Sequence, residues 1–294
     1  LGVDPDPLLA LAGTIAAGSM PGADGSGGLL ETAEQSGLVD RRPGLAVPTA
    51  EVADGLAHST LLSAPFSGDT DAAEELLVDL DCPASEADYD EDAWMRLASA
   101  VAVETSTSES STPAAAEAVE TALRPYATPN GPFATLGGYA DVLSALAAET
   151  PGLAISLALG TPGITDESLD TWRDHASAAH RALDEPITGR YEGCFVLRVD
   201  TDRPAALPTI ARLTRKFRSP EPVALVVTAD PVDGQRHAAA AAAADDPRGL
   251  AGVLSTVATE FGGTAGGTPT EATLSVDGDV SDGDLIAAVR EALE

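Results

Sequence analysis

The 294-residue chain carries 47 acidic and 16 basic side chains, a formal net charge of −31, and 44% of its residues are hydrophobic. A hydrophobic share of this size can bury a large core, which excludes wholesale disorder and allows one large α/β domain or two ordinary domains. Fifteen basic residues are Arg and only Lys216 is Lys, a composition that a cytoplasm at molar salt favours. The Debye length there is roughly 3 Å, so the acidity does not exclude nucleic acid as a partner.

Simple features of the chain exclude several further classes. The cysteines are one widely separated pair, Cys82 and Cys194, without a CxxC motif, so neither a disulfide framework nor a structural zinc site is indicated. The longest uncharged stretch, residues 7–23, is short, contains glycine and is interrupted by Pro21, which argues against a membrane span. No basic segment precedes it, so no signal peptide is expected and the predicted location is cytoplasmic. Because the chain starts at Leu1, we expect an N-terminal part to be missing.

The first part of the chain contains helical patterns and a long acidic run. Residues 69–92 are densely acidic, which is typical of a solvated surface. Residues 105–112 have the composition of a linker, and the three prolines of 125–132 mark a domain boundary, so we predict domains over residues 1–125 and 126–294. Helices are predicted over residues 8–17, 29–38 and 113–123, and a weak strand over residues 45–47.

The second part of the chain alternates helical patterns with short apolar runs. We predict helices over residues 139–148, 167–183, 207–217, 250–261 and 282–293, and strands over residues 194–199, 223–227 and 272–276, with a further apolar run at 153–159. Ser281 is a good N-cap for the last helix. The alternation predicts an α/β fold in two domains, the second with a mixed sheet and flanking helices.

The histidines do not indicate a metal site. His175 and His180 are about 140° apart around one predicted helix, so they do not share a face, and we expect both at the surface. His58 and His237 have no obvious carboxylate partners at useful spacing. From the sequence we therefore predict no catalytic residue and no metal ligand.

A basic island is the first local feature that stands out in so acidic a chain. It consists of Arg212, Arg215, Lys216 and Arg218. On the predicted helix, Ile210, Leu213 and Phe217 would face the sheet and the basic side chains would lie largely on the other side. Two interpretations remain open: a helix face paired with neighbouring carboxylates, or a contact with a nucleic-acid backbone, since arginine matches phosphate oxygens.

A glycine-rich segment between a helix and a strand is the second such feature. It contains Gly262, Gly263, Gly266 and Gly267 and ends at Thr268. Glycines there would let backbone amides approach a phosphate or another backbone closely. The same composition also fits a plain connection.

Three stretches make the chain resemble the later part of RecJ-like DHH-family phosphoesterases, the archaeal group related to the GINS-associated nuclease. Residues 11–17 (LAGTIAA) resemble the family's G-T-(I/V)-A-D segment. Residues 54–60 (DGLAHST), running on to 65–69 (PFSGD), resemble the stretch before the interdomain linker. Residues 262–273 resemble the motif G-G-x-x-G-G-H-x-x-A-A-G of the DHH-associated domain. The resemblance implies the remainder of a DHH-type domain up to residue 125, followed by a DHH-associated nucleic-acid-binding domain.

The resemblance also implies a function class, with departures. The family implies hydrolysis of single-stranded DNA or RNA with Mn²⁺ or Mg²⁺, in DNA replication or repair. However, Ala17 stands where the family has a metal-binding aspartate, Thr268 stands for the motif's histidine, and Glu271 puts a carboxylate where a phosphate should approach. We therefore expect weak or absent catalysis. The alternatives are a non-catalytic replisome scaffold with a GINS-type partner, or a phosphodiesterase for small oligonucleotides or cyclic dinucleotides.

Overall fold

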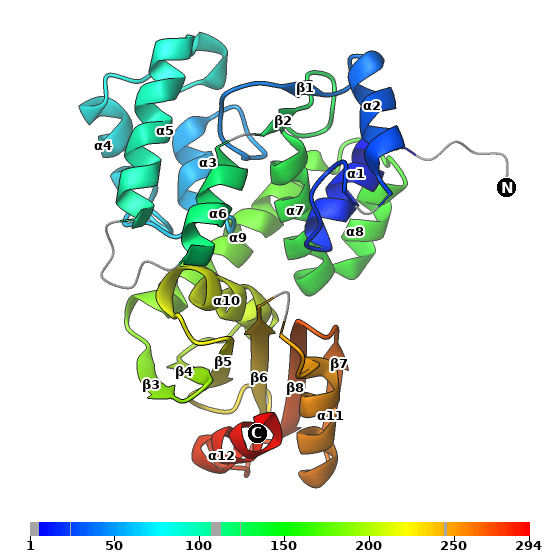
Figure 1. Cartoon of the computed structure of the whole chain (residues 1–294), viewed down its shortest axis with the longest axis vertical. Helices are drawn as coiled ribbons and strands as arrows, with labels where there is room; N and C mark the ends of the chain where they lie inside the picture. The colour runs from blue at the N-terminus through cyan, green and yellow to red at the C-terminus, as the bar shows by residue number, and fades with distance from the viewer. Residues whose placement is uncertain (1–5, 24, 107–112, 124, 244–245) are drawn as a thin grey trace, which may run out of the picture. The chain divides into compact units, whose positions relative to one another are not determined.

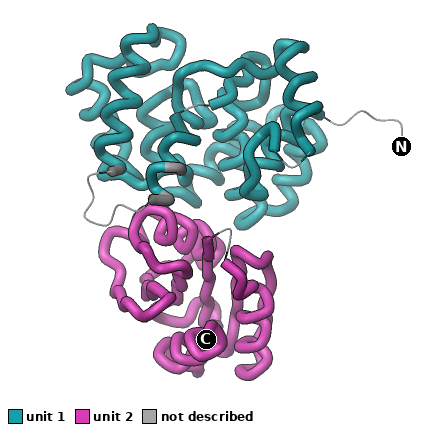
Figure 2. Tube along the Cα trace, viewed as in Figure 1, with its two compact units in different colours: residues 1–108, 115–177 teal, residues 109–114, 178–294 magenta. Residues whose placement is uncertain are grey.

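The computed structural model describes residues 6–23, 25–106, 113–123, 125–243 and 246–294, which form two compact units (Figure 1, Figure 2). Unit 1 comprises residues 1–108 and 115–177, and unit 2 comprises residues 109–114 and 178–294. This division differs from the predicted boundary after residue 125. Residues 126–149 belong to unit 1 because the strand β2 pairs with β1, and because the helix α7 packs on α1.

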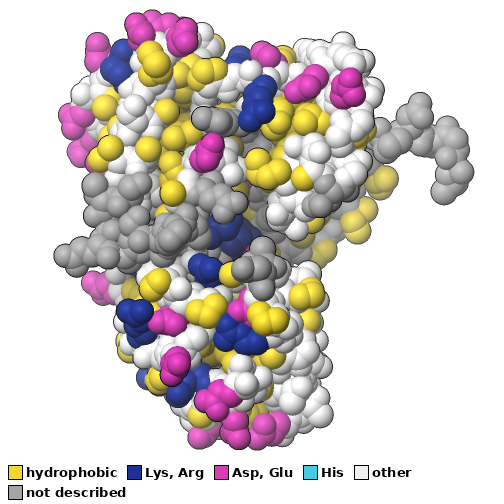
Figure 3. Space-filling model, in the orientation of Figure 1, with side chains coloured by type: hydrophobic (Ala, Val, Ile, Leu, Met, Phe, Trp, Pro, Cys, Tyr) yellow, Lys and Arg dark blue, Asp and Glu magenta, His cyan; other side chains and the backbone are white. Residues whose placement is uncertain are grey.

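Unit 1 is almost entirely helical. Its elements are α1 (Pro7–Ala16), α2 (Gly27–Gln35), β1 (Asp40–Arg41), α3 (Val52–His58), α4 (Thr70–Asp79), a 3-10 turn (Glu86–Asp88), α5 (Glu91–Ser106), α6 (Pro113–Ala122), β2 (Tyr126–Ala127), α7 (Leu136–Glu149), α8 (Pro151–Ala158) and the first part of α9 (Thr165–Asp184). The predicted helices over residues 8–17, 29–38, 113–123, 139–148 and 167–183 are thus confirmed to within a few residues. The acidic segment forms α4 and the approach to α5, and acidic side chains gather at the surface of this part of unit 1 (Figure 3). Its carboxylates Asp71, Glu74 and Glu75 are exposed, as predicted.

The buried segment at residues 45–48 packs against α7. The predicted strand over residues 45–47 is wrong, because its backbone bonds go to the end of α6 and to α7 instead of to a partner strand: Ala46 N donates to Ala122 O, and Thr135 Oγ1 donates to Val47 O. The helix crosses this segment in direct backbone contact. A Cβ atom added to Gly138 would lie 2.2 Å from Pro48 N.

Unit 2 contains one six-stranded sheet in the order β3-β4-β5-β6-β8-β7. The strands are β3 (Ile187–Tyr191), β4 (Cys194–Val199), β5 (Val223–Thr228), β6 (Gln235–Ala242), β7 (Thr264–Gly267) and β8 (Glu271–Asp277). Only β4 and β5 are parallel, and every other neighbouring pair in the sheet is antiparallel. The sequence predicted β4, β5 and β8 correctly, but it did not predict β3, β6 or β7.

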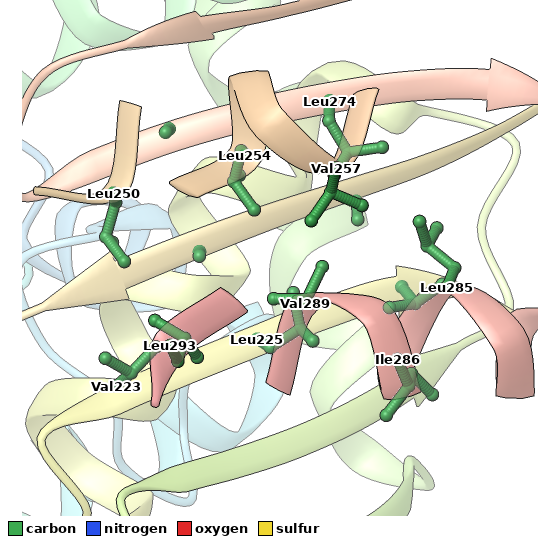
Figure 4. Close-up of a cluster of buried hydrophobic side chains, with 14 of the residues drawn as sticks. Val223, Leu225, Leu250, Leu254, Val257, Leu274, Leu285, Ile286, Val289 and Leu293 are labelled. Carbon is green, nitrogen blue, oxygen red and sulfur yellow. The ribbon is translucent and has the colours of Figure 1, made fainter. Parts of the chain in front are cut away.

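Helices cover the sheet of unit 2. On one face, α11 (Leu250–Glu260) and α12 (Asp282–Leu293) bury leucine and valine side chains against alternate residues of β5, β6 and β8 (Figure 4). The helix α10 (Leu207–Leu213) packs on β5 and β6, whose other alternate residues are also buried. Ser281 caps α12 as predicted, since its hydroxyl accepts a hydrogen bond from Asp284 N at 3.0 Å. None of the helices in the described ranges is long and apolar enough to cross a membrane.

Candidate functional site

The basic island lies at the end of α10, where the helix widens into a single π turn (Thr214–Arg218). The predicted helix over residues 207–217 is therefore an α-helix as far as Leu213 and continues as the π turn. Ile210, Leu213 and Phe217 are buried as predicted. The four basic side chains are each half-buried. Such π turns are frequent at functional sites, because the extra residue redirects the side chains that follow.

Two of the four basic residues donate hydrogen bonds to backbone carbonyls. Arg215 Nε donates to Pro222 O at 3.1 Å, and Arg218 Nη1 donates to Leu183 O. Burial lowers the pKa of Arg218, although the nearby Asp184 acts in the opposite direction. A carbonyl oxygen orients a guanidinium without cancelling its charge, so these two bonds leave the positive charges of Arg215 and Arg218 in place.

The glycine-rich segment is an edge strand followed by a turn, so the interpretation as a plain connection is wrong, and its glycines closely approach another backbone, that of β8. Gly262 has a φ of +70° where α11 ends, and the next residues form β7 against β8. A Cβ atom added to Gly263 would lie 2.2 Å from Ser275 O, and one added to Gly267, with its φ of +142°, would lie 2.3 Å from Glu271 O. Glycine is required at both positions because the backbone of β8 approaches so closely.

Thr268, at the position of the family's histidine, closes the turn between β7 and β8. Its hydroxyl accepts a hydrogen bond from Glu271 N at 3.1 Å, and its amide donates to Glu271 O at 2.7 Å. The carbonyls of Thr268 and Pro269 accept bonds from the first amides of α11, Ala251 N at 3.2 Å and Leu250 N at 2.8 Å. These amides are thus already bonded within the fold and do not offer an anion site.

The sheet brings the glycine turn and part of the basic island to the same end. Cys194, Val223 and Ala242 are in register across β4, β5 and β6, and Ala242 N donates to Thr270 O at 2.8 Å. The island reaches this end through the bond from Arg215 to Pro222. Three further arginines lie there: Arg190, Arg248 and Arg290. The sequence gives no signal for them, because they come from three separate segments.

Carboxylates and an aromatic ring hold the additional arginines. Arg190 Nε bonds Glu221 Oε1 at 2.8 Å, and Arg248 Nε bonds Asp246 Oδ1 at 2.9 Å. These hydrogen bonds are the main reason that the pKa values of both carboxyls are lowered. Arg290 lies over the Tyr191 ring, 3.7 Å from its centroid, in a cation–π contact. The end of the sheet is therefore rich in arginine but partly neutralised.

A second polar cluster lies in unit 1, within the motif DGLAHST. Asp54 and His58 are one turn apart on α3, and His58 Nδ1 lies 3.0 Å from Asp54 Oδ1. Arg173 on α9 binds both carboxylate oxygens of Asp54, with Nε at 2.9 Å and Nη2 at 3.0 Å. Burial would raise the pKa of Asp54, but hydrogen bonds from His58 and Arg173 outweigh it and hold that pKa well below its ordinary value.

The adjacent buried carboxylate, Asp141 on α7, joins the same motif to α9. It accepts hydrogen bonds from Thr60 N at 2.9 Å, from Thr60 Oγ1 and from Trp172 Nε1 at 3.0 Å. Asp141, Thr60 and Trp172 are each at most 3% exposed. The Trp172 ring also meets His58 edge-on, at 5.7 Å between ring centroids. The motif residues therefore act together as a structural clasp between α3, α7 and α9.

The histidines of α9 and α3 correct two sequence predictions. His175 and His180 are 1% and 3% exposed, so they are not surface residues: they lie on the buried side of an amphipathic helix. His175 Nδ1 is 2.9 Å from Glu149 Oε1. His58 also has the carboxylate partner that was not recognised, four residues before it in the sequence, and this helical spacing could have revealed it.

The described residues do not fit the Mn²⁺ or Mg²⁺ that the resemblance implies. Among them, no three His, Cys, Asp or Glu side chains lie close enough to hold a metal ion. Ala17, at the family's aspartate position, is exposed at the end of α1 and has no donor atom. The half-buried Asp54 and the buried Asp141 accept hydrogen bonds from protein side chains and amides. No catalytic step through a metal follows from this donor set.

The Asp54→Asn variant is expected to lose about 2 kcal/mol of unfolding free energy at pH 7, because it loses the charge that Arg173 binds. The folded-state pKa of Asp54 is lowered, so its contribution is present above the ordinary value of 3.8 and is lost as the pH falls below it. Urea unfolding at several pH values should show the gap between wild type and variant closing below about pH 4. Asp170→Asn is the matched control: Asp170 also pairs with Arg173 but is 76% exposed, and it should change little. A gap that does not depend on pH would contradict the assignment.

Comparison with known structures places the fold in a class. The crystal structure of CDC45 from Entamoeba histolytica superposes with a TM-score of 0.60 and covers 97% of this chain and 67% of that chain, at 8% sequence identity. The fold is thus similar to that of CDC45, and the predicted two-part α/β class is confirmed. At sequence level, the family model "Uncharacterized protein rrnAC1427, C-terminal domain" matches residues 186–291. The protein rrnAC1427 of Haloarcula marismortui is 49% identical over an alignment 294 residues long, and the match covers 98% of this chain and 72% of that protein. The chain belongs to the rrnAC1427 family.

Proposed function

We propose that this chain is a RecJ-like scaffold protein of DNA replication or repair that binds partners and does not itself hydrolyse phosphodiester bonds. The observation that carries the proposal is the pairing of a CDC45-like fold over 97% of the chain with carboxylates that serve structure. A scaffold protein must keep its fold in order to bind partners. The clasp of Asp54, Asp141 and Arg173 holds α3, α7 and α9 together. A GINS-type protein is the partner that the resemblance implies.

The setting that we propose is a cytoplasm at high salt. The formal net charge of −31 and the near absence of lysine support it, and so does the halophilic source of the relative rrnAC1427. At molar salt, charged surfaces associate through close, well-shaped contacts, because longer-range attraction is screened. Assays of this protein therefore belong in molar KCl.

Hydrolysis of 5′-labelled single-stranded DNA by the full-length protein, in molar KCl with and without Mn²⁺, tests the proposal. We expect no metal-dependent release of nucleotides, and we expect the protein to comigrate with the GINS-type protein of its own organism in gel filtration. A RecJ-like exonuclease that is active at the same salt concentration is the positive control. Metal-dependent release of mononucleotides would overturn the scaffold proposal and would show that Ala17 and Thr268 are tolerated in a working nuclease.

Binding of single-stranded nucleic acid is a second candidate function. It is favoured by the two guanidiniums of the basic island that are held by carbonyls instead of carboxylates. Arginines held in this way would contact phosphates without reading sequence, and the glycine turn lies at the same end of the sheet. This function is compatible with a scaffold, because a strand can be held without being cut.

The double variant Arg215→Glu, Lys216→Glu is expected to bind single-stranded DNA at least tenfold more weakly, with a lower dependence of log K on log salt. Fluorescence anisotropy of a labelled oligonucleotide over a series of KCl concentrations measures both quantities. Arg181→Glu changes charge at an exposed position elsewhere in unit 2 and is the matched control. Equal binding by the wild type and the double variant would show that the island is only a structural feature of the helix.

A further inference from the structure

A cavity of about 660 Å³ in unit 1 belongs to none of the features discussed so far. It lies between the segment after β1, the 3-10 turn and the start of α5. Its charged and aromatic lining residues are Arg42, Glu86, Tyr89, Asp90, Glu91 and Trp94. All of them belong to unit 1.

The wall of the cavity combines aromatic rings with carboxylates. The Tyr89 and Trp94 rings lie 4.2 Å apart between centroids, tilted by 34°. Three carboxylates and one guanidinium line the cavity, which gives it a formal charge of −2. This charge disfavours an anionic ligand such as a nucleotide and favours a cationic one, and aromatic rings favour cations that are weakly hydrated and planar.

Several acceptor oxygens of the cavity are free within the part of the chain that the structure describes. Asp90 Oδ1 accepts a hydrogen bond from Ala93 N at 2.8 Å, and its second oxygen accepts none there. The side chain of Glu91 makes neither a hydrogen bond nor an ion pair to any described residue, and Glu91 is exposed at the rim. A ligand with several N–H donors could therefore find acceptors without breaking bonds in the fold.

The cavity already binds one guanidinium. Arg42 Nη2 pairs with Glu86 Oε1, and this is the only bond that either side chain makes to the described residues. The Arg42 side chain is 46% exposed, whereas that of Glu86 is 16% exposed. Arg42 is thus held at one point only, and its removal would uncover Glu86 in the wall of the cavity.

We infer that this cavity receives an arginine side chain from a protein partner. Arginine fits better than lysine because its planar fork can bond two carboxylate oxygens at once and can stack on an aromatic ring. The incoming guanidinium would bond Glu86 in competition with Arg42 and would meet Asp90 or Glu91 at the rim. The identification of the occupant as a protein segment rests on the proposed scaffold role; the chemistry of the cavity does not.

Titration with the peptide acetyl-Gly-Arg-Gly-amide in molar KCl tests the inference. The readout is the NMR signal of the Trp94 indole N–H, assigned with Trp94→Phe; the chain has only one other indole, that of Trp172. We expect saturable shifts of the Trp94 signal, and none from the same peptide with citrulline, the neutral isostere of arginine. The lysine peptide should bind several-fold more weakly.

Two variants are expected to move the affinity in opposite directions. Glu86→Gln should weaken binding of the arginine peptide about tenfold, because it removes the charged acceptor. Arg42→Ala should tighten binding several-fold, because it removes the internal competitor, and its exposure makes misfolding no concern. Glu74→Gln, an exposed carboxylate of α4 outside the cavity, is the matched control and should change nothing.

The outcomes separate this inference from the proposed function. Equal shifts with the citrulline peptide, equal affinity for the lysine peptide, or unchanged affinity in both variants would each overturn the arginine site. None of these results would alter the outcome of the hydrolysis assay. Conversely, metal-dependent hydrolysis together with saturable arginine binding would overturn the scaffold role and leave the cavity assignment standing.

Discussion

Replacement of Asp141 by alanine is expected to lower the unfolding free energy of unit 1 by about 3–5 kcal/mol, the largest effect that we predict for a polar residue. The side chain is 3% exposed and accepts three hydrogen bonds, from Thr60 N, Thr60 Oγ1 and Trp172 Nε1. Alanine would remove the acceptor of all three bonds, and the cost of breaking a buried bond from one side exceeds the net value of the bond itself. Asp141→Asn should lower the unfolding free energy less than Asp141→Ala does, because the amide oxygen of asparagine can still accept a hydrogen bond.

Tryptophan fluorescence during urea unfolding measures this effect in unit 1 alone, because both tryptophans, Trp94 and Trp172, lie in that unit. Ser144→Ala, on the same helix, is the control: its hydroxyl donates to Ala140 O within the helix, so a change below about 0.5 kcal/mol is expected. If Asp141→Ala loses no more than Ser144→Ala, the buried clasp does not stabilise the unit.

Gly138→Ala is expected to destabilise unit 1 by about 3 kcal/mol or more, through a single added methyl group. The new Cβ would lie 2.2 Å from both Pro48 N and Val47 C. These are backbone atoms, so no change of side-chain rotamer can relieve the clash. The helix α7 would have to lift from the segment at residues 45–48, and the bonds from Thr135 Oγ1 to Val47 O and from Ala134 N to Pro48 O would lengthen.

Gly152→Ala in α8 provides the matched comparison, because a Cβ atom there meets nothing within 4 Å. Alanine in that helix should leave stability unchanged or raise it by about 0.5–1 kcal/mol, since it restricts the unfolded chain. Thermal unfolding followed by circular dichroism compares the two variants in one buffer. Equal melting temperatures for the two variants would mean that α7 and its supporting segment can separate at no cost.

The sequence predicted those elements whose local pattern agrees with their place in the fold. β4 and β5 are runs of large apolar residues and were found, as was α12, whose cap is formed by Ser281. β6 was not, because it is built from successive alanines, the residue with the highest helix propensity, and only pairing with β5 and β8 makes it a strand. β7 was not found because glycine is unfavourable in strands and is needed there only for the close approach of β8.

The polar sites could be predicted from the sequence only where their partners are near in the chain. The pair of Asp54 and His58 has helical spacing and lies within a recognised motif. Arg173 lies 119 residues from Asp54, and Asp141 lies 81 residues from Thr60, so only the packing of α3, α7 and α9 reveals these contacts. The resemblance to the RecJ-like family anticipated the fold, whereas binding of nucleic acid by the basic island and the glycine turn stays a prediction.

The alanine strand β6 also determines the order in which unit 2 can assemble. In isolation, a segment such as Ala238–Ala242 gains more from helical turns than from an extended form, and its small side chains bring little apolar surface to an early collapse. We therefore expect β6 to become extended only when β5 or β8 already offers it an edge. Because β6 lies between these two strands in the sheet, we expect the glycine turn and the arginines at the end of the sheet to come together only once β6 has paired with both.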